Sequence, residues 1–396
     1  MIKMIKDKIA IYKDELIQLT KEMVQIDSVI FNEKEIIDFL ANKMVEYGYD
    51  EVIVDDMGNL IGRIGDGNKV IAIDGHVDTV EQGDLANWEF DPLKGKEDDK
   101  IIFGRGSCDQ KGGVASAIFA GRILKEIGLP KDTKLYVVCS ILEEFFEGMN
   151  WQFIIDNKLI KPDVVILTEP SGLELTLGHR GRCDINVSVK GISSHGSEPD
   201  KGENAIYKMN EIITDLMKLH SSLPTDEIFG KDTLAVTKVR SEAVSINAVP
   251  DGCSIIIDRR LSRNDTLESV LKEIRNLKSV KKHNAEVKVA KSEGKSYSGF
   301  AYSVDCFYPT WILNEEHPMA QKAKMVYKTM FAKDPQIKYW RFSTNGVATM
   351  GKYNIPTIGF GPGEEKYAHT SEEQLPKDHL IKALEFYISF CLEFSK

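Results

Sequence analysis

A short apolar run in the first fifth of the chain ends at a histidine and an aspartate two positions apart. The segment IAIDGHVDTV, residues 71–80, overlaps a predicted buried strand over Val70–Ile73, and His76 falls just past its carboxyl end. Ligands and catalytic groups collect at that edge of open α/β sheets. Asp78 can accept the second ring N–H of His76, as the partner of a metal-binding histidine does. Taken alone, the segment fits an ordinary polar turn equally well.

Other side chains of metal-ligand type also follow predicted strands or begin a predicted helix. With His76, the candidate ligands are Asp109, Glu144, Glu169 and His369. Two histidines and three carboxylates without sulfur suit zinc, and the same set tolerates cobalt or manganese. Three carboxylate charges against two divalent cations leave one positive charge, which a hydroxide would cancel. The set therefore favours two metal ions over one.

Glu143 and Glu144 are adjacent at the end of a predicted strand over 135–142. Adjacent residues of a strand point to opposite sides. One carboxylate can therefore bind a metal while its neighbour faces the substrate as a general base. A solvated acidic turn is the plain alternative for such a pair.

Composition excludes several classes of protein. The 396 residues are 42% hydrophobic and 28% charged, as in globular enzymes, and the net charge of −10 disfavours nucleic acid or anionic membranes as partners. We find no apolar segment of membrane-spanning length, no secretory signal and no phosphate-binding GxxxxGK[ST] motif. Six scattered cysteines without CxxC pairs indicate reduced thiols. The expected location is cytoplasmic.

The length predicts more than one domain. We expect an α/β catalytic domain in two parts, residues 1–180 and 295–396, interrupted by a second domain over residues 181–294. In the insertion, predicted strands and helices follow the order βαββαβ, which is typical of a ferredoxin-like unit. They cover residues 183–189, 205–219, 234–239, 253–261, 266–277 and 285–289. Pairing of its exposed sheet edges across a twofold axis predicts a homodimer.

Motifs along nearly the whole chain resemble the M20 family of dinuclear zinc peptidases and amidohydrolases, and most closely its YgeY-like branch. They are GHVDTV, GRGSCDQKGG, the EE pair, TEP, ISSHGSEP, INAVPDG with DRR, and GFGPGEEKYAHT. The resemblance implies a zinc-peptidase-like domain with a mixed central sheet flanked by helices, and an inserted lid and dimerisation domain. The family includes acetylornithine deacetylase, succinyl-diaminopimelate desuccinylase, aminoacylase and glutamate carboxypeptidase types.

The resemblance also implies roles for the metal-site residues. His76 and Glu169 would bind one zinc ion, Glu144 and His369 the other, and Asp109 would bridge them. Glu143 would be the general base and Asp78 the partner of His76. A non-proline cis peptide is implied after Asp109.

In the inserted domain, the resemblance assigns substrate contacts. His195 corresponds to a histidine that stabilises the reacting carbonyl across the dimer. Asn247 and Arg260 correspond to lid residues that hold the carboxylate of the substrate. The implied reaction is hydrolysis of an amide bond beside a free carboxylate, in an N-acyl or N-carbamoyl amino acid or a dipeptide.

Three departures from the family pattern concern the substrate more than the metals. Glu372 stands where many relatives have asparagine, Thr349 and Met350 replace a Ser-Asp pair, and Cys108 replaces a small residue or serine. An aminopeptidase is an alternative that would need an acidic pocket for an amine, where the sequence offers Arg260. A ligand-binding relative without activity is the other alternative, against which the intact ligand set and Glu143 argue.

Overall fold

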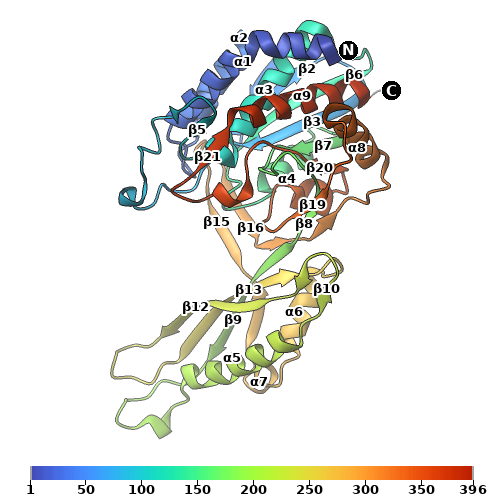
Figure 1. The fold of residues 1–396 in the computed structure, drawn as a ribbon. Helices are drawn as coiled ribbons and strands as arrows, with labels where there is room; N and C mark the ends of the chain where they lie inside the picture. Colours follow the sequence, from blue (N-terminus) through green and yellow to red (C-terminus); the bar gives the residue numbers. More distant parts are fainter. Residues whose placement is uncertain (1, 395–396) are drawn as a thin grey trace.

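The computed structural model describes residues 2–394, which form two parts joined by a narrow waist (Figure 1). The larger part contains both ends of the chain and a mixed sheet that has nine strands within the described residues. Its order is β1 (Glu51–Val54), β2 (Leu60–Ile64), β6 (Thr133–Ser140), β3 (Lys69–His76), β7 (Val164–Leu167), β20 (Thr357–Gly359), β8 (Leu175–His179) and β18 (Trp311–Ile312), with β19 (Ile337–Trp340) also paired to β8. The mixed sheet predicted from the family resemblance is confirmed.

The central strands are buried on both faces, which explains their unbroken apolar runs. In β3, Ile71 and Ile73 pack into one core while Ala72 faces a second core that contains Trp151 of α4. The helices are α1 (Ile2–Gln25), α2 (Lys34–Glu46), α3 (Gly112–Ile127), α4 (Met149–Asp156), α8 (Pro318–Phe331) and α9 (Lys377–Phe394). None of the described helices combines the length and apolarity that crossing a membrane requires.

The smaller part is built on a separate antiparallel sheet with its own core. Its elements are β9 (Gly181–Lys190), α5 (Ala205–Ser222), β12 (Leu234–Glu242), β13 (Gly252–Leu261), α6 (Leu267–Arg275), α7 (Lys278–Lys282) and β14 (Glu286–Val289). The strand order β12-β13-β9-β14 is that of the βαββαβ unit expected from the sequence. In β9, Cys183 and Ile185 face the core beneath the helices, so Arg182 and Asp184 point to the opposite face.

The return from the smaller part runs through a hairpin and two short strands. The hairpin pairs β15 (Lys291–Lys295) with β16 (Ala301–Asp305); β17 (Phe307–Tyr308) then still pairs with β9, and β18 rejoins the large sheet. Tyr297, in the hairpin, donates a hydrogen bond to the carbonyl of Gly58 at 2.8 Å, which attaches it to the larger part. The minor pairings are β4 (Lys96–Glu97), β5 (Ile101–Phe103) and β21 (Gln374–Pro376), and β10 (Thr225–Asp226) with β11 (Gly230–Lys231).

Candidate metal centre

The candidate site lies at the carboxyl edge of three neighbouring parallel strands, β6, β3 and β7. His76 is the last residue of β3, which runs three residues further than the sequence predicts, and it pairs with Ser140 of β6. Glu143 and Glu144 follow the end of β6, and Glu169 follows β7. The sheet thus brings together side chains that are nearly a hundred positions apart in the sequence.

The orientation of His76 is fixed by a backbone carbonyl. Its Nδ1 lies 2.9 Å from the carbonyl oxygen of Asp78, whereas the nearest carboxylate oxygen of Asp78 is 3.8 Å away. The hydrogen bond expected from the Asp78 side chain is therefore made by its main chain, while Oδ2 of that carboxylate accepts the backbone N–H of Glu144 at 3.0 Å. With Nδ1 engaged, Nε2 of His76 is directed at the acidic cluster.

Asp109 lies between the two candidate histidine ligands. Its Oδ1 is 3.2 Å from Nε2 of His76, and its Oδ2 is 3.3 Å from Nε2 of His369. The same nitrogen of His369 is 2.9 Å from Glu144. His369 has a left-handed backbone with φ of 61°, an uncommon conformation that residues of functional sites adopt. One carboxylate therefore faces both histidines, as a bridging ligand requires.

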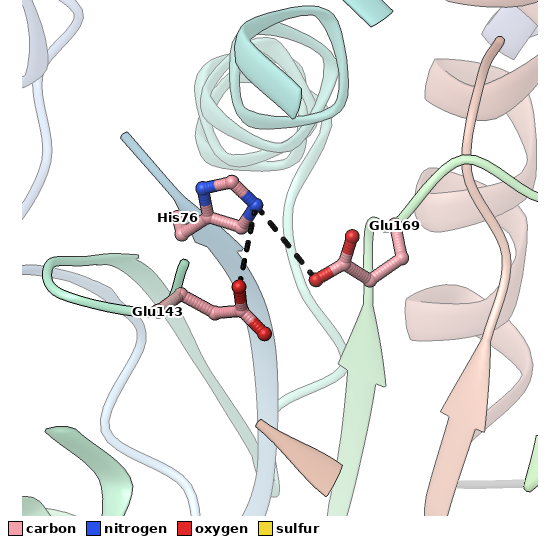
Figure 2. A group of neighbouring side chains, drawn as sticks. All are labelled: His76, Glu143 and Glu169. Carbon is pink, nitrogen blue, oxygen red and sulfur yellow. Dashed lines mark ion pairs between the residues drawn. The ribbon is translucent and has the colours of Figure 1, made fainter. Parts of the chain in front are cut away.

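Two further carboxylates approach the same ring nitrogen of His76 (Figure 2). Oε2 of Glu143 is 3.8 Å and Oε1 of Glu169 is 3.9 Å from Nε2 of His76. All three side chains are buried, and Oε1 of Glu143 has no hydrogen-bond partner. His76 with Glu143 and Glu169, and His76 with Asp109 and Glu144, each gather donor atoms closely enough to hold one ion.

The loop that carries Asp109 is anchored from below by Glu373. The peptide bond from Asp109 to Gln110 is cis, as the family resemblance predicts. One oxygen of Glu373 accepts the backbone N–H groups of Cys108 and Asp109, both at 3.0 Å, and the other accepts from Arg105 at 2.6 Å. Glu373 thus holds Asp109 through the main chain of that residue.

The electrostatics of the cluster fit cations. Burial and the neighbouring Glu169 raise the pKa of Glu143 well above its usual value. Burial would lower the pKa of His76, but its hydrogen bond to Asp109 and the other carboxylates raise it well above normal. Hydrogen bonds to Asp109 and Glu144 raise the pKa of His369 to about 10. So many buried acids require positive charge, and the oxygen and imidazole donors suit divalent ions of the zinc type.

A cavity of about 330 Å³ opens beside this cluster. It is lined by the acidic ligands and His369 and also by Glu147, Arg182, Arg260 and Glu365. Arg260 is thus placed in the site, as predicted, but it also makes two hydrogen bonds to Asp258 at 2.9 and 3.0 Å. That local pairing on the same strand is the alternative to substrate binding for Arg260.

His195 and Asn247 do not line this cavity. Both are exposed and lie together on the smaller part, where the N–H of Gly196 donates to the carbonyl of Asn247 at 2.6 Å. Nδ1 of His195 contacts the hydroxyl of Ser197 at 2.7 Å. Within this chain, the two residues are therefore separate from the metal ligands.

Three residues of the site were missed in the sequence. Glu373 follows His369 by four positions in HTSEE, a signal that the motif contained. Glu147 lies four positions after Glu143, and Arg182 is the second residue of β9. No spacing rule singles out the last two, because their position in the cavity depends on how the two parts meet.

Fold and site together define a metal-binding α/β hydrolase. Residues 72–393 match the family described as Peptidase family M20/M25/M40, and the chain belongs to this family. It is similar to the uncharacterized protein YgeY of Escherichia coli strain K12, with 40% identity over 98% of this chain and 97% of the relative.

A probable succinyl-diaminopimelate desuccinylase of Staphylococcus epidermidis (strain ATCC 12228) is 24% identical over 95% of this chain and 96% of its own. Among solved structures, the aminopeptidase PepT of Bacillus cereus has a TM-score of 0.73 at 22% identity, over 97% of this chain and 99% of the other. The predicted family and the prediction of an amide-bond hydrolase are thus confirmed.

Proposed function

We propose that the protein is a two-metal hydrolase that cleaves an amide bond beside a free carboxylate, in an N-acyl or N-carbamoyl amino acid or a dipeptide. The observation that carries the proposal is the position of Asp109, whose two oxygens face His76 and His369 at 3.2 and 3.3 Å. A single carboxylate shared in this way suits two ions side by side. Zinc is the proposed metal, and the ligands also suit cobalt or manganese.

His76, Asp109 and Glu169 would hold one ion, and Asp109, Glu144 and His369 the other. When bound, such ions polarise the scissile carbonyl and lower the pKa of the attacking water. Glu143 takes the proton of that water on its unpartnered Oε1 and passes it to the leaving nitrogen. Glu143 is shielded from bulk solvent, because only 5% of its surface is exposed.

The smaller part serves in this proposal as a lid and a dimerisation domain. Strand β12 is at the edge of its sheet and is largely exposed, with apolar Val239 and the following Val244 and Ile246 open to solvent. A second copy would cover that edge. His195 and Asn247 would then reach the metal centre of the partner, where His195 donates a hydrogen bond to the developing oxyanion.

A second candidate is an aminopeptidase. Glu147 and Glu365 line the same cavity as Arg260 and could bind a substrate amine. A hydrolysis screen of the metal-loaded protein over N-acyl amino acids, N-carbamoyl amino acids and free dipeptides separates the two. Cleavage of N-blocked substrates supports the proposal, whereas cleavage confined to substrates with a free amine and indifferent to a terminal carboxylate overturns it.

A further inference from the structure

Two arginines stand directly opposite each other where the inserted sheet meets the metal cavity. In the antiparallel pairing of β9 with β13, Arg182 is the register partner of Arg260, and Asp184 is the partner of Asp258. Like charges directly opposite destabilise an antiparallel pair. Both arginines line the cavity that contains the metal ligands. An anion bound between the two guanidinium groups would offset their repulsion.

The two arginines differ in how firmly their donors are engaged. Arg260 makes a paired contact with Asp258 at 2.9 and 3.0 Å. Arg182 reaches both oxygens of Glu147 only at 3.4 Å and Asp184 only at 3.6 Å. Charge-assisted hydrogen bonds are normally shorter than this. Arg182 is therefore the less firmly engaged cation of the pair.

The guanidinium of Arg182 is nevertheless held in place by other contacts. It lies 4.8 Å from the ring centre of Tyr308, its register partner on β17. Its neighbour Cys183 is fully buried in the core of the smaller part. The side chain is thus oriented towards the cavity while its N–H donors lack a close acceptor, which is the arrangement of a preformed anion site.

Glu147 comes from the other part of the molecule. It lies in the loop that begins with Glu143 and Glu144, and its side chain is 13% exposed, against 23% for Arg182. Its carboxylate oxygens, at 3.4 Å, are closer to the Arg182 donors than Asp184 is at 3.6 Å. A substrate carboxylate that took its place would restore short, paired hydrogen bonds.

We infer that Arg182 binds the substrate carboxylate together with Arg260, and that Glu147 occupies this position as an internal competitor until the substrate displaces it. The inference rests on the proposed function and names the residues that would bind the free carboxylate of its substrates. Their carboxamides, which are neutral, cannot compete with Glu147 for Arg182.

Binding to an inactive enzyme tests this without turnover. The metal-loaded Glu143→Gln protein is titrated by calorimetry with N-acetyl amino acids that have apolar, acidic or basic side chains, and with the carboxamide of the tightest. Adding Arg182→Met should weaken binding of the acid about tenfold or more and leave the carboxamide within about twofold. Adding Glu147→Gln should tighten binding of the acid several-fold and leave the carboxamide unchanged.

Two further variants serve as controls. Arg182→Lys keeps the positive charge but loses the paired N–H donors of the guanidinium, so it should lower the affinity for the acid to an intermediate degree. This variant tests the inference even if Arg182→Met fails to fold. Arg275→Met removes a charge from α6, on the opposite side of the same sheet, and should leave the affinities for the acid and for the carboxamide unchanged. Melting temperatures confirm that each variant is folded.

The outcomes are distinct. Any of three results overturns the inference. The first is that Arg182→Met and Arg182→Lys weaken binding of the acid and of the carboxamide equally. The others are that Glu147→Gln leaves the affinity for the acid unchanged or lower, and that no acid binds at all. The wild-type enzyme could hydrolyse no amide and still bind the acid more tightly than the carboxamide. If Arg182→Met abolishes that difference, the proposed function fails but the binding of a carboxylate by the two arginines is supported. If the wild-type enzyme hydrolyses amides and binds the acid more tightly than the carboxamide, but Arg182→Met does not change that preference, the role of the two arginines is disproved and the proposed function stands.

Discussion

The carboxylate of Glu373 accepts the backbone N–H of Asp109 at 3.0 Å and thus holds the main chain of Asp109 rather than its side chain. Both carboxylate oxygens of Glu373 are engaged, because the second accepts from Arg105. The side chains of Glu373 and Arg105 are 0% and 4% exposed. The two carboxylate oxygens of Asp109 therefore face the two histidines.

Glu373→Gln should destabilise the protein and weaken metal binding. Removing one partner of a buried ion pair costs about 3–5 kcal/mol, and losing the support of a ligand lowers metal affinity roughly 10- to 100-fold. Thermal unfolding and metal titration measure the two effects. Glu372→Gln, next to it but exposed, is the matched control and should change neither. Equal behaviour of the two variants would contradict the role of Glu373.

Glu143→Gln and Glu144→Gln should fail in different ways. The first should keep its metal and lose activity by at least roughly two orders of magnitude, because only the proton acceptor is removed. The second should lose metal first, because Glu144 contacts His369 at 2.9 Å and would share its ion. Metal content and kcat are measured on the same preparations. Loss of metal from Glu143→Gln would show that Glu143 is a ligand.

Chelator-stripped protein should take up close to two equivalents of zinc per chain. In the proposed arrangement the two ions share Asp109, whose oxygens lie 3.2 Å from His76 and 3.3 Å from His369. Uptake should also raise the melting temperature, since a ligand at 100 times its Kd stabilises the folded state by about 2.7 kcal/mol. Elemental analysis and calorimetry follow the titration. Saturation of stability and activity at one equivalent would contradict a two-metal site.

Mixing Glu143→Gln with His195→Ala under conditions of subunit exchange should restore part of the activity. His195 does not line the metal cavity of its own chain, so a mixed dimer could regain one intact composite site. Exchange is followed by differently tagged subunits. If exchange is demonstrated and activity stays at the level of the separate variants, the partner subunit does not supply His195.

Stability should fall on mild acidification because of His179, which lies at the crossover between the two parts. It is fully buried, its Nδ1 lies 3.0 Å from the carbonyl of Arg180, and its Nε2 accepts the N–H of Thr344 at 3.0 Å. Burial lowers its pKa to about 4, below the value of 6.5 in the unfolded chain.

The unfolded chain therefore binds a proton below pH 6.5 that the folded protein does not. Stability from this group is complete above pH 6.5 and is lost as the pH falls towards 4. Between pH 7 and pH 5 the loss should be about 2 kcal/mol. Urea unfolding of the wild type and of His179→Gln at both pH values measures it. A variant that is as sensitive to acid as the wild type would contradict this assignment.

The sequence by itself determined the strands and the chemistry at their ends. Short unbroken apolar runs bounded by polar or turn residues, such as Val164–Leu167, favour strands buried on both faces, and the polar residue after such a run is then expected at the sheet edge. Local rules are enough for this, because periodicity and the end of an apolar run are properties of neighbouring residues. The ferredoxin-like order of the insertion followed from the same alternation.

Only the tertiary structure decided which of these groups meet. That both oxygens of Asp109 face histidines depends on three loops converging from distant segments, and the spacing of residues 76, 109 and 369 contains no such distances. The carbonyl oxygen of Asp78 lies 2.9 Å from His76 and its carboxylate 3.8 Å away, a difference that residue spacing does not contain. Arg182 faces Arg260 through strand register, and a shift of one residue would turn its side chain away from the cavity.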